Sequence, residues 1–132
     1  MNKTDIINKE FDYDWINNNT VHHNYLIKSV ENIIKIENTS NIELLDIGCG
    51  NGYLTQKISK FFKHSTGIDL SRTGIEKAQK LKSDKLEFKN IGLEEIINQG
   101  KKFKFITSFE VIEHQYLPDD FLNQINKILT DD

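Results

Sequence analysis

The sequence predicts an α/β fold built around a parallel sheet, and two observations lead to this class. Short apolar runs alternate four times with segments whose apolar residues recur at helical spacing. The chain has 132 residues, of which 37% are hydrophobic and 28% are charged, values typical of one globular domain. Strands and helices that alternate in this way imply parallel strands, right-handed crossovers and helices on both faces of the sheet.

Each apolar run is short enough to be a buried strand, and each segment between two runs carries helix signals. The expected strands are residues 43–47, 65–70, 86–90 and 102–109. The expected helices are residues 21–36, 53–62, 72–81, 93–99 and 118–129. Ser71 suits an N-cap, Gly100 suits a helix stop, and Pro118 suits the first turn of the last helix. Residues 1–19 are polar with interspersed aromatics, so an arm or short helix that docks on the domain is expected.

Composition narrows the classes of partner. The net charge is −3 and charges of both signs are mixed along the chain, a balance that argues against a nucleic-acid partner. The single cysteine, Cys49, cannot form an internal disulfide and fits a reducing compartment. The apolar runs are too short for a membrane span, and the N-terminus is too polar for a signal peptide. A cytoplasmic protein with no membrane partner is therefore expected.

A cluster of glycines follows the first expected strand. In LLDIGCGNGYL, residues 44–54, the glycines are Gly48, Gly50 and Gly52. Glycine allows a sharp turn and lets the backbone approach a ligand closely. The helix that follows offers free N–H groups and a positive dipole end. Because ligands bind at the carboxyl ends of parallel strands, this turn is the expected site for a polar or anionic group.

Two nucleotide-binding motifs fit this turn poorly. A dinucleotide fingerprint needs G-x-G-x-x-G, whereas the spacing here is G-x-G-x-G. A P-loop needs a lysine followed by serine or threonine, and neither follows Gly52. Asp69 ends the second expected strand about 20 residues beyond the glycines, the spacing at which a carboxylate takes ribose hydroxyls.

These motifs together resemble those of class I S-adenosylmethionine-dependent methyltransferases. LLDIGCGNGYLT is similar to the glycine motif of that family, GIDLS to its acidic ribose-binding motif, and FITSFEVIEH to the segment around its fourth strand. The resemblance implies a Rossmann-like three-layer sandwich with strands ordered 3-2-1-4, which lacks the family's usual strands 5-7-6. Residues 42–132 are then the cofactor-binding half of the domain, on which residues 1–41 pack as an arm and helix.

The resemblance also implies which residues hold S-adenosylmethionine. Asp46 and the glycine loop would surround the methionine part, Asp69 would take the ribose hydroxyls, and Leu70 would lie against adenine. The full implied set is Asp46, Gly48, Cys49, Gly50, Asn51, Gly52, Asp69, Leu70, Gly92, Leu93 and Phe109. Glu94 is a candidate for the acidic residue that many members carry near the third strand. Nothing in the sequence pairs with Cys49 to make it a nucleophile.

An E-x-x-E-H pattern follows the fourth expected strand. Glu110, Glu113 and His114 would share one side of a helical turn, and they are ligands that suit Mg²⁺, Mn²⁺ or Zn²⁺. The pattern is similar to ubiquinone-biosynthesis O-methyltransferases and to small-RNA 3′-terminal 2′-O-methyltransferases. The second branch uses a further downstream histidine, which this chain lacks. Related strings occur without a metal in other methyltransferases, where His114 is a general base or only a polar neighbour.

The resemblance favours methyl transfer to an oxygen of a small-molecule or sugar-like acceptor. One alternative is a cofactor-binding module or fragment that is inactive without a partner or the missing C-terminal half, and another is a fragment of an RNA 3′-end methyltransferase. The fourth strand lacks its usual neighbour, and the alternatives for its exposed edge are cover by the N-terminal arm, cover by a second copy or a partner chain, or no cover.

Overall fold

The computed structural model describes residues 21–109 and 111–131. The expected N-terminal arm and Glu110 lie outside these residues. The strands are β1 (Glu43–Ile47), β2 (His64–Ile68), β3 (Leu86–Lys89) and β4 (Phe105–Thr107). The α-helices are α2 (Val21–Glu37), α3 (Tyr53–Ser59), α4 (Arg72–Ala78), α5 (Leu93–Asn98) and α6 (Pro118–Ile128). Two short 3₁₀ helices are η1 (Gln79–Leu81) and η2 (Ile112–His114).

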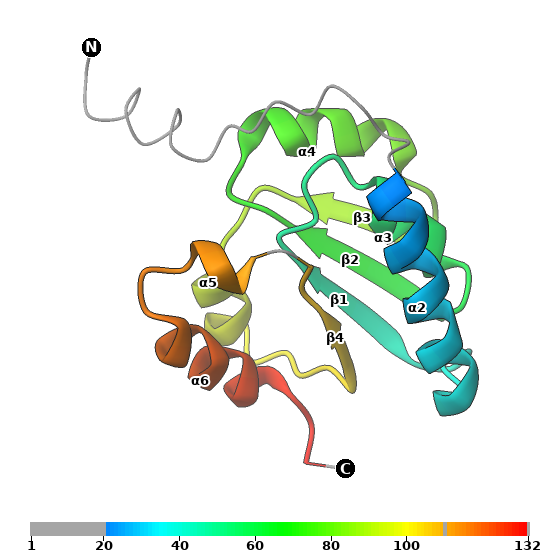
Figure 1. Cartoon of the computed structure of the whole chain (residues 1–132). Helices are drawn as coiled ribbons and strands as arrows, with labels where there is room; N and C mark the ends of the chain where they lie inside the picture. The colour runs from blue at the N-terminus through cyan, green and yellow to red at the C-terminus, as the bar shows by residue number, and fades with distance from the viewer. Residues whose placement is uncertain (1–20, 110, 132) are drawn as a thin grey trace.

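The four strands form one parallel sheet in the order β3-β2-β1-β4, which confirms the predicted α/β class and strand order. Helices α5 and α6 cover one face, while α2, α3 and α4 cover the other (Figure 1). Alternate residues of β1 separate the two sides, since Leu45 packs toward α5 and α6 and Leu44 packs toward α2 and α3. The carboxyl ends of the strands therefore meet at one edge, next to the glycine loop.

The predicted helix signals lie at real helix ends. Ser71 caps α4, because its hydroxyl accepts a hydrogen bond from the Gly74 N–H at 3.1 Å. Pro118 is the first residue of α6, and Gly100 follows α5 with a φ of 69°. The expected helix over 72–81 divides into α4 and η1, and α3 ends at Ser59 rather than at Phe62. After α3 the chain turns so that the Phe62 ring packs edge-on against Phe105, with ring centroids 5.1 Å apart.

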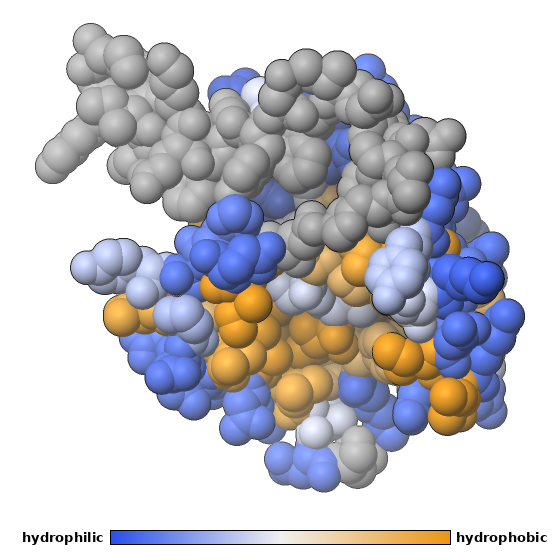
Figure 2. Space-filling model, viewed as in Figure 1, coloured by the Kyte–Doolittle hydropathy of each residue, from blue (hydrophilic) through white to orange (hydrophobic). Residues whose placement is uncertain are grey.

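The fourth strand is shorter than the expected 102–109. Phe103 lies before β4 and pairs with the end of α6, where its N–H donates to the carbonyl of Ile128, the last residue of that helix, at 2.8 Å. The Phe103 carbonyl accepts from the Thr130 N–H at 3.0 Å, which makes a parallel bridge to Leu129. This isolated bridge lies before β4 begins, and among the described residues β4 itself is an edge strand of the sheet. Figure 2 shows apolar residues gathered over β4 and beside α6 on this side of the molecule.

None of the helices in the described segments is long and apolar enough to cross a membrane.

Candidate functional site

The glycine loop joins β1 to α3 and folds over the end of β2. Gly48, Gly50 and Gly52 all have positive φ, at 75°, 56° and 79°. The N–H groups of Gly48 and Cys49 both donate to the Ile68 carbonyl, at 2.8 and 3.0 Å. A side chain at a positive φ is strained, so this loop path requires glycine.

Protein side chains occupy the room at two of these glycines. A Cβ on Gly52 would lie 2.7 Å from Phe88 Cζ and 2.9 Å from Ala78 Cβ, and a Cβ on Gly48 would overlap Val111. At Gly52 the loop backbone therefore packs closely against β3 and α4, and at Gly48 it packs closely against the segment after β4. The prediction that the glycine loop makes room for a ligand therefore does not rest on the Cβ positions of Gly48 and Gly52.

Asp46 lies buried at the end of β1 with a relative exposure of 2%. Its Oδ2 accepts a hydrogen bond from the Thr55 hydroxyl at 2.5 Å, and its Oδ1 accepts from the Thr107 hydroxyl at 2.7 Å. Burial raises the pKa of Asp46 from 3.8 to about 6, the two hydroxyls oppose the rise, and the negative charge of Asp69 adds to it.

Asp69 follows β2 and connects the loop to the next helix. Its Oδ2 accepts from the Gly50 N–H at 2.8 Å, and its Oδ1 accepts from the Ser71 N–H at 2.7 Å. Burial raises the pKa of Asp69, and these backbone hydrogen bonds oppose the rise. The Leu70 N–H is a further backbone donor to this carboxylate, and because a carboxylate has about four acceptor positions, about one remains for a hydroxyl group of a ligand.

Two further loop residues have local structural roles. The Asn51 side-chain oxygen accepts a hydrogen bond from the Tyr53 N–H at 3.1 Å, at the start of α3. Cys49 is buried, and that burial raises the pKa of its thiol well above the usual range. The thiol therefore stays protonated at neutral pH. A protonated thiol is a poor nucleophile, in agreement with the sequence, in which no residue pairs with Cys49 to activate it.

The residues expected at the adenine end divide into two groups. The exposed Leu70 side chain reaches Gly92, with Leu70 Cδ2 3.3 Å from the position of a Cβ on Gly92. The Leu93 side chain packs instead into the core against α6, so only its backbone can line this end. Glu94 is exposed, and the neighbouring Glu95 accepts from the Gly92 N–H at 2.9 Å.

Phe109 and the E-x-x-E-H pattern follow β4. The Phe109 side chain packs against the apolar cluster of α2 and α3. Glu113 and His114 lie in the 3₁₀ helix η2, half-exposed, with His114 Nε2 3.9 Å from Glu113 Oε1. Within the described segments no three acidic, histidine or cysteine side chains are grouped to hold a metal ion. A metal site would need Glu110, which lies outside those segments, so metal binding stays a prediction.

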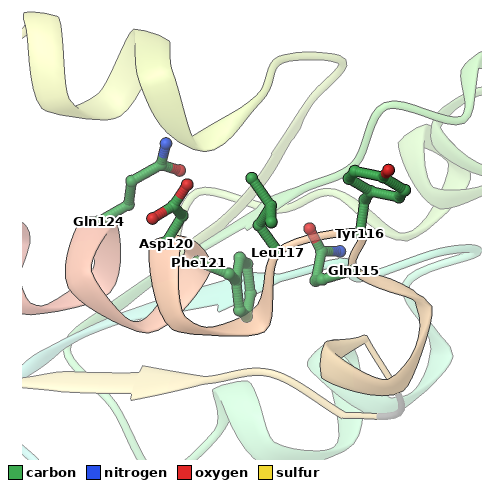
Figure 3. A pocket seen from close by; sticks show the side chains of 6 residues that line it. All are labelled: Gln115, Tyr116, Leu117, Asp120, Phe121 and Gln124. Atoms are coloured by element: carbon green, nitrogen blue, oxygen red, sulfur yellow. The ribbon is translucent and has the colours of Figure 1, made fainter.

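A hollow of about 260 Å³ opens beside η2, at the start of α6. Its lining residues are Gln115, Tyr116, Leu117, Asp120, Phe121 and Gln124. Figure 3 shows Leu117, Asp120 and Gln124 on one side of the α6 ribbon and Phe121 on the other, toward the strands. The sequence predicts none of these residues as a site residue, and it predicts Asp120 and Phe121 only as structural residues of the last helix.

The comparisons with known proteins agree with this arrangement. The family profile described as "Methyltransferase domain" matches residues 20–132. This chain belongs to that methyltransferase family. A ubiquinone biosynthesis O-methyltransferase of Pelagibacter ubique is 32% identical over 120 residues, which cover 86% of this chain and 50% of that protein. The chain thus spans about half the length of this curated relative, and 37% of a relative from Bartonella tribocorum that is 30% identical.

Solved methyltransferases share the fold. The plantazolicin methyltransferase BpumL, in complex with a monoazolic desmethylPZN analog and SAH, gives a TM-score of 0.69 at 23% identity, over 83% of this chain and 44% of that one. Magnesium protoporphyrin IX methyltransferase from Synechocystis PCC 6803, with bound SAH, gives 0.71 at 17% identity, over 97% and 64% of the two chains. At these identities the likeness establishes a methyltransferase fold.

One structural glycine of this methyltransferase fold was missed in the sequence. A Cβ on Gly67, in the middle of β2, would lie 2.7 Å from Phe88 Cδ1 and 3.0 Å from Cys49 Cβ. Gly67 thus lets the loop residue Cys49 and the β3 side chain Phe88 pack onto the sheet. A glycine inside an expected strand is the signal that could have identified it.

The buried carboxyl group of Asp46 should make the stability of this methyltransferase domain depend on pH. Between pH 4 and 6 the folded chain keeps a proton on Asp46 that the unfolded chain has lost, so stability falls as pH rises through the folded pKa of about 6. A shift of about two pKa units is worth about 3 kcal/mol. We expect Asp46→Asn to flatten the urea-derived stability curve between pH 4 and 8 by about that amount. Parallel curves for the two proteins would contradict the shifted pKa.

Proposed function

We propose that this chain binds S-adenosylmethionine and transfers its methyl group to an oxygen of a small-molecule acceptor. The observation that carries the proposal is the Asp69 carboxylate, which accepts from the Gly50 and Ser71 N–H groups and retains an acceptor position. It stands at the carboxyl ends of β1 and β2, where parallel sheets bind nucleotides. The solved relatives BpumL and the protoporphyrin methyltransferase contain SAH, the demethylated form of this cofactor.

In this proposal the cofactor lies across the glycine loop. One of its ribose hydroxyls donates to Asp69, its adenine lies against Leu70 and Gly92, and its methionine part lies over the loop near Asp46. The exposed Leu70 side chain beside Gly92 supports the adenine position, since an exposed leucine gains from covering by an aromatic ring. The sulfonium methyl is already activated, so the protein mainly has to align donor and acceptor and exclude water.

The acceptor is proposed to lie beyond the carboxyl end of β4, on the side of η2. A hydroxyl acceptor gains from a general base, and His114 is our candidate for that role. The curated relatives named ubiquinone biosynthesis O-methyltransferase favour an oxygen of a small molecule over an RNA end.

The test is binding followed by transfer. Titration calorimetry with S-adenosylmethionine and S-adenosylhomocysteine is expected to give dissociation constants in the micromolar range, on the order of −8 kcal/mol of binding free energy. Radioactive methyl transfer into a panel of phenolic and sugar-like acceptors, with and without Mg²⁺ or Mn²⁺, is expected to label at least one hydroxyl. No heat from folded protein at high micromolar ligand would refute cofactor binding. Binding without transfer to any acceptor would identify a cofactor-binding module instead.

A further inference from the structure

Three buried side chains from three elements meet beneath the glycine loop. Asp46 belongs to β1, Thr55 to α3 and Thr107 to β4, and each is less than 9% exposed. The parallel register places Thr107 directly beside Asp46, where its hydroxyl donates to Oδ1 at 2.7 Å. The Thr55 hydroxyl reaches Oδ2 at 2.5 Å from the opposite side of the carboxyl group. Both oxygens of Asp46 thus accept a hydrogen bond from a threonine.

The other groups that act on Asp46 disfavour its negative charge. Asp69, which follows β2, is a like charge that raises the pKa of Asp46. Burial adds to this effect, and within the described residues the two hydroxyls are what favours the ionised form. Removing either hydroxyl should therefore make ionisation of Asp46 harder.

We propose that Thr55 and Thr107 are positioning residues that act through Asp46 to keep a fixed negative charge beneath the loop that receives the positively charged sulfonium of S-adenosylmethionine. This inference rests on the proposed function. A sulfonium carries a positive charge that the demethylated product lacks, so an ionised Asp46 favours the methyl donor over S-adenosylhomocysteine. The threonines would then set the pH range in which the donor binds well.

The variants Thr55→Val and Thr107→Val remove one hydroxyl each at nearly constant shape, and Thr55→Ser and Thr107→Ser restore it. Thr66→Val is the matched control, because Thr66 is also buried in the sheet and donates to Glu87, at 3.2 Å, rather than to Asp46. The Asp46 carboxyl carbon is followed by ¹³C NMR as a function of pH, and S-adenosylmethionine and S-adenosylhomocysteine affinities are measured by calorimetry from pH 5 to 9. Circular dichroism and urea unfolding establish that each variant is folded.

Each valine variant is expected to raise the Asp46 titration midpoint by about one pH unit, with serine restoring it and Thr66→Val leaving it in place. The double variant Thr55→Val/Thr107→Val should bind S-adenosylmethionine about tenfold more weakly at pH 7, because only about a tenth of Asp46 is then ionised. The loss should disappear near pH 9 and be smaller for the uncharged product.

Three results would overturn the proposal in distinguishable ways. If the native chain binds the donor but the valine variants bind it with an unshifted pH profile, the threonines are structural residues only and the proposed function stands. If the Asp46 midpoint shifts as expected but the native chain binds no cofactor, the proposed function fails and the positioning role fails with it. A folded valine variant with an unchanged Asp46 midpoint also overturns the positioning role.

Discussion

Replacing Gly52 with alanine is expected to lower the free energy of unfolding by about 3 kcal/mol, the largest effect on stability that we predict. Two costs combine at this position. The backbone φ of 79° is unfavourable for alanine, and the new Cβ would lie 2.7 Å from the Phe88 ring and 2.9 Å from Ala78. Because both neighbours are buried core residues, the clash cannot be relieved by turning a side chain into solvent.

Gly100→Ala is the matched control. Gly100 has a similar φ of 69°, but a Cβ there would contact nothing within 4 Å. Only the backbone cost remains, about 1 kcal/mol. Urea unfolding of the two variants and the native chain measures both values. Equal losses would show that the packing of the loop against β3 and α4 contributes nothing beyond backbone strain.

Local patterns predicted the α/β class and most element bounds, and the family resemblance implied the strand order. The run over 43–47, ELLDI, is buried on both faces, and its predicted ends agree with β1. The run over 102–109 predicted too long a strand, because Phe103 does not extend β4. Its N–H instead donates to the Ile128 carbonyl at the end of α6. That pairing joins residues far apart in the sequence, and no local periodicity encodes it.

The candidate site shows the same division. The glycine spacing and Asp69 identified the loop, because positive φ and a carboxylate after the next strand are local features. Residue patterns could not predict which atoms lie where a Cβ on Gly52 would be. The structure shows that the Phe88 ring lies there. Nor could residue patterns pair Asp46 with Thr107, since only the parallel register of β1 and β4 brings these residues together across the chain.

Asp69→Ala is expected to weaken cofactor binding about 100-fold, the largest effect on binding that we predict. A ribose hydroxyl donating to a carboxylate is worth up to about 3 kcal/mol, which corresponds to that ratio. Calorimetry with S-adenosylhomocysteine measures the loss, and Asp84→Ala, at an exposed aspartate between η1 and β3, should leave the affinity unchanged.

The loop contacts of Asp69 complicate the simple substitution, because the carboxylate also accepts from Gly50 and Ser71. A ligand that lacks the ribose 2′-hydroxyl separates the two roles. If Asp69 binds the ribose, the native chain should prefer S-adenosylhomocysteine over its 2′-deoxy analogue about tenfold, and Asp69→Ala should show almost no preference. If Asp69 only shapes the loop, the variant should lose affinity for both ligands by the same factor. Because the four affinities form a double-mutant cycle, any disturbance of the loop cancels and the ribose contact is isolated.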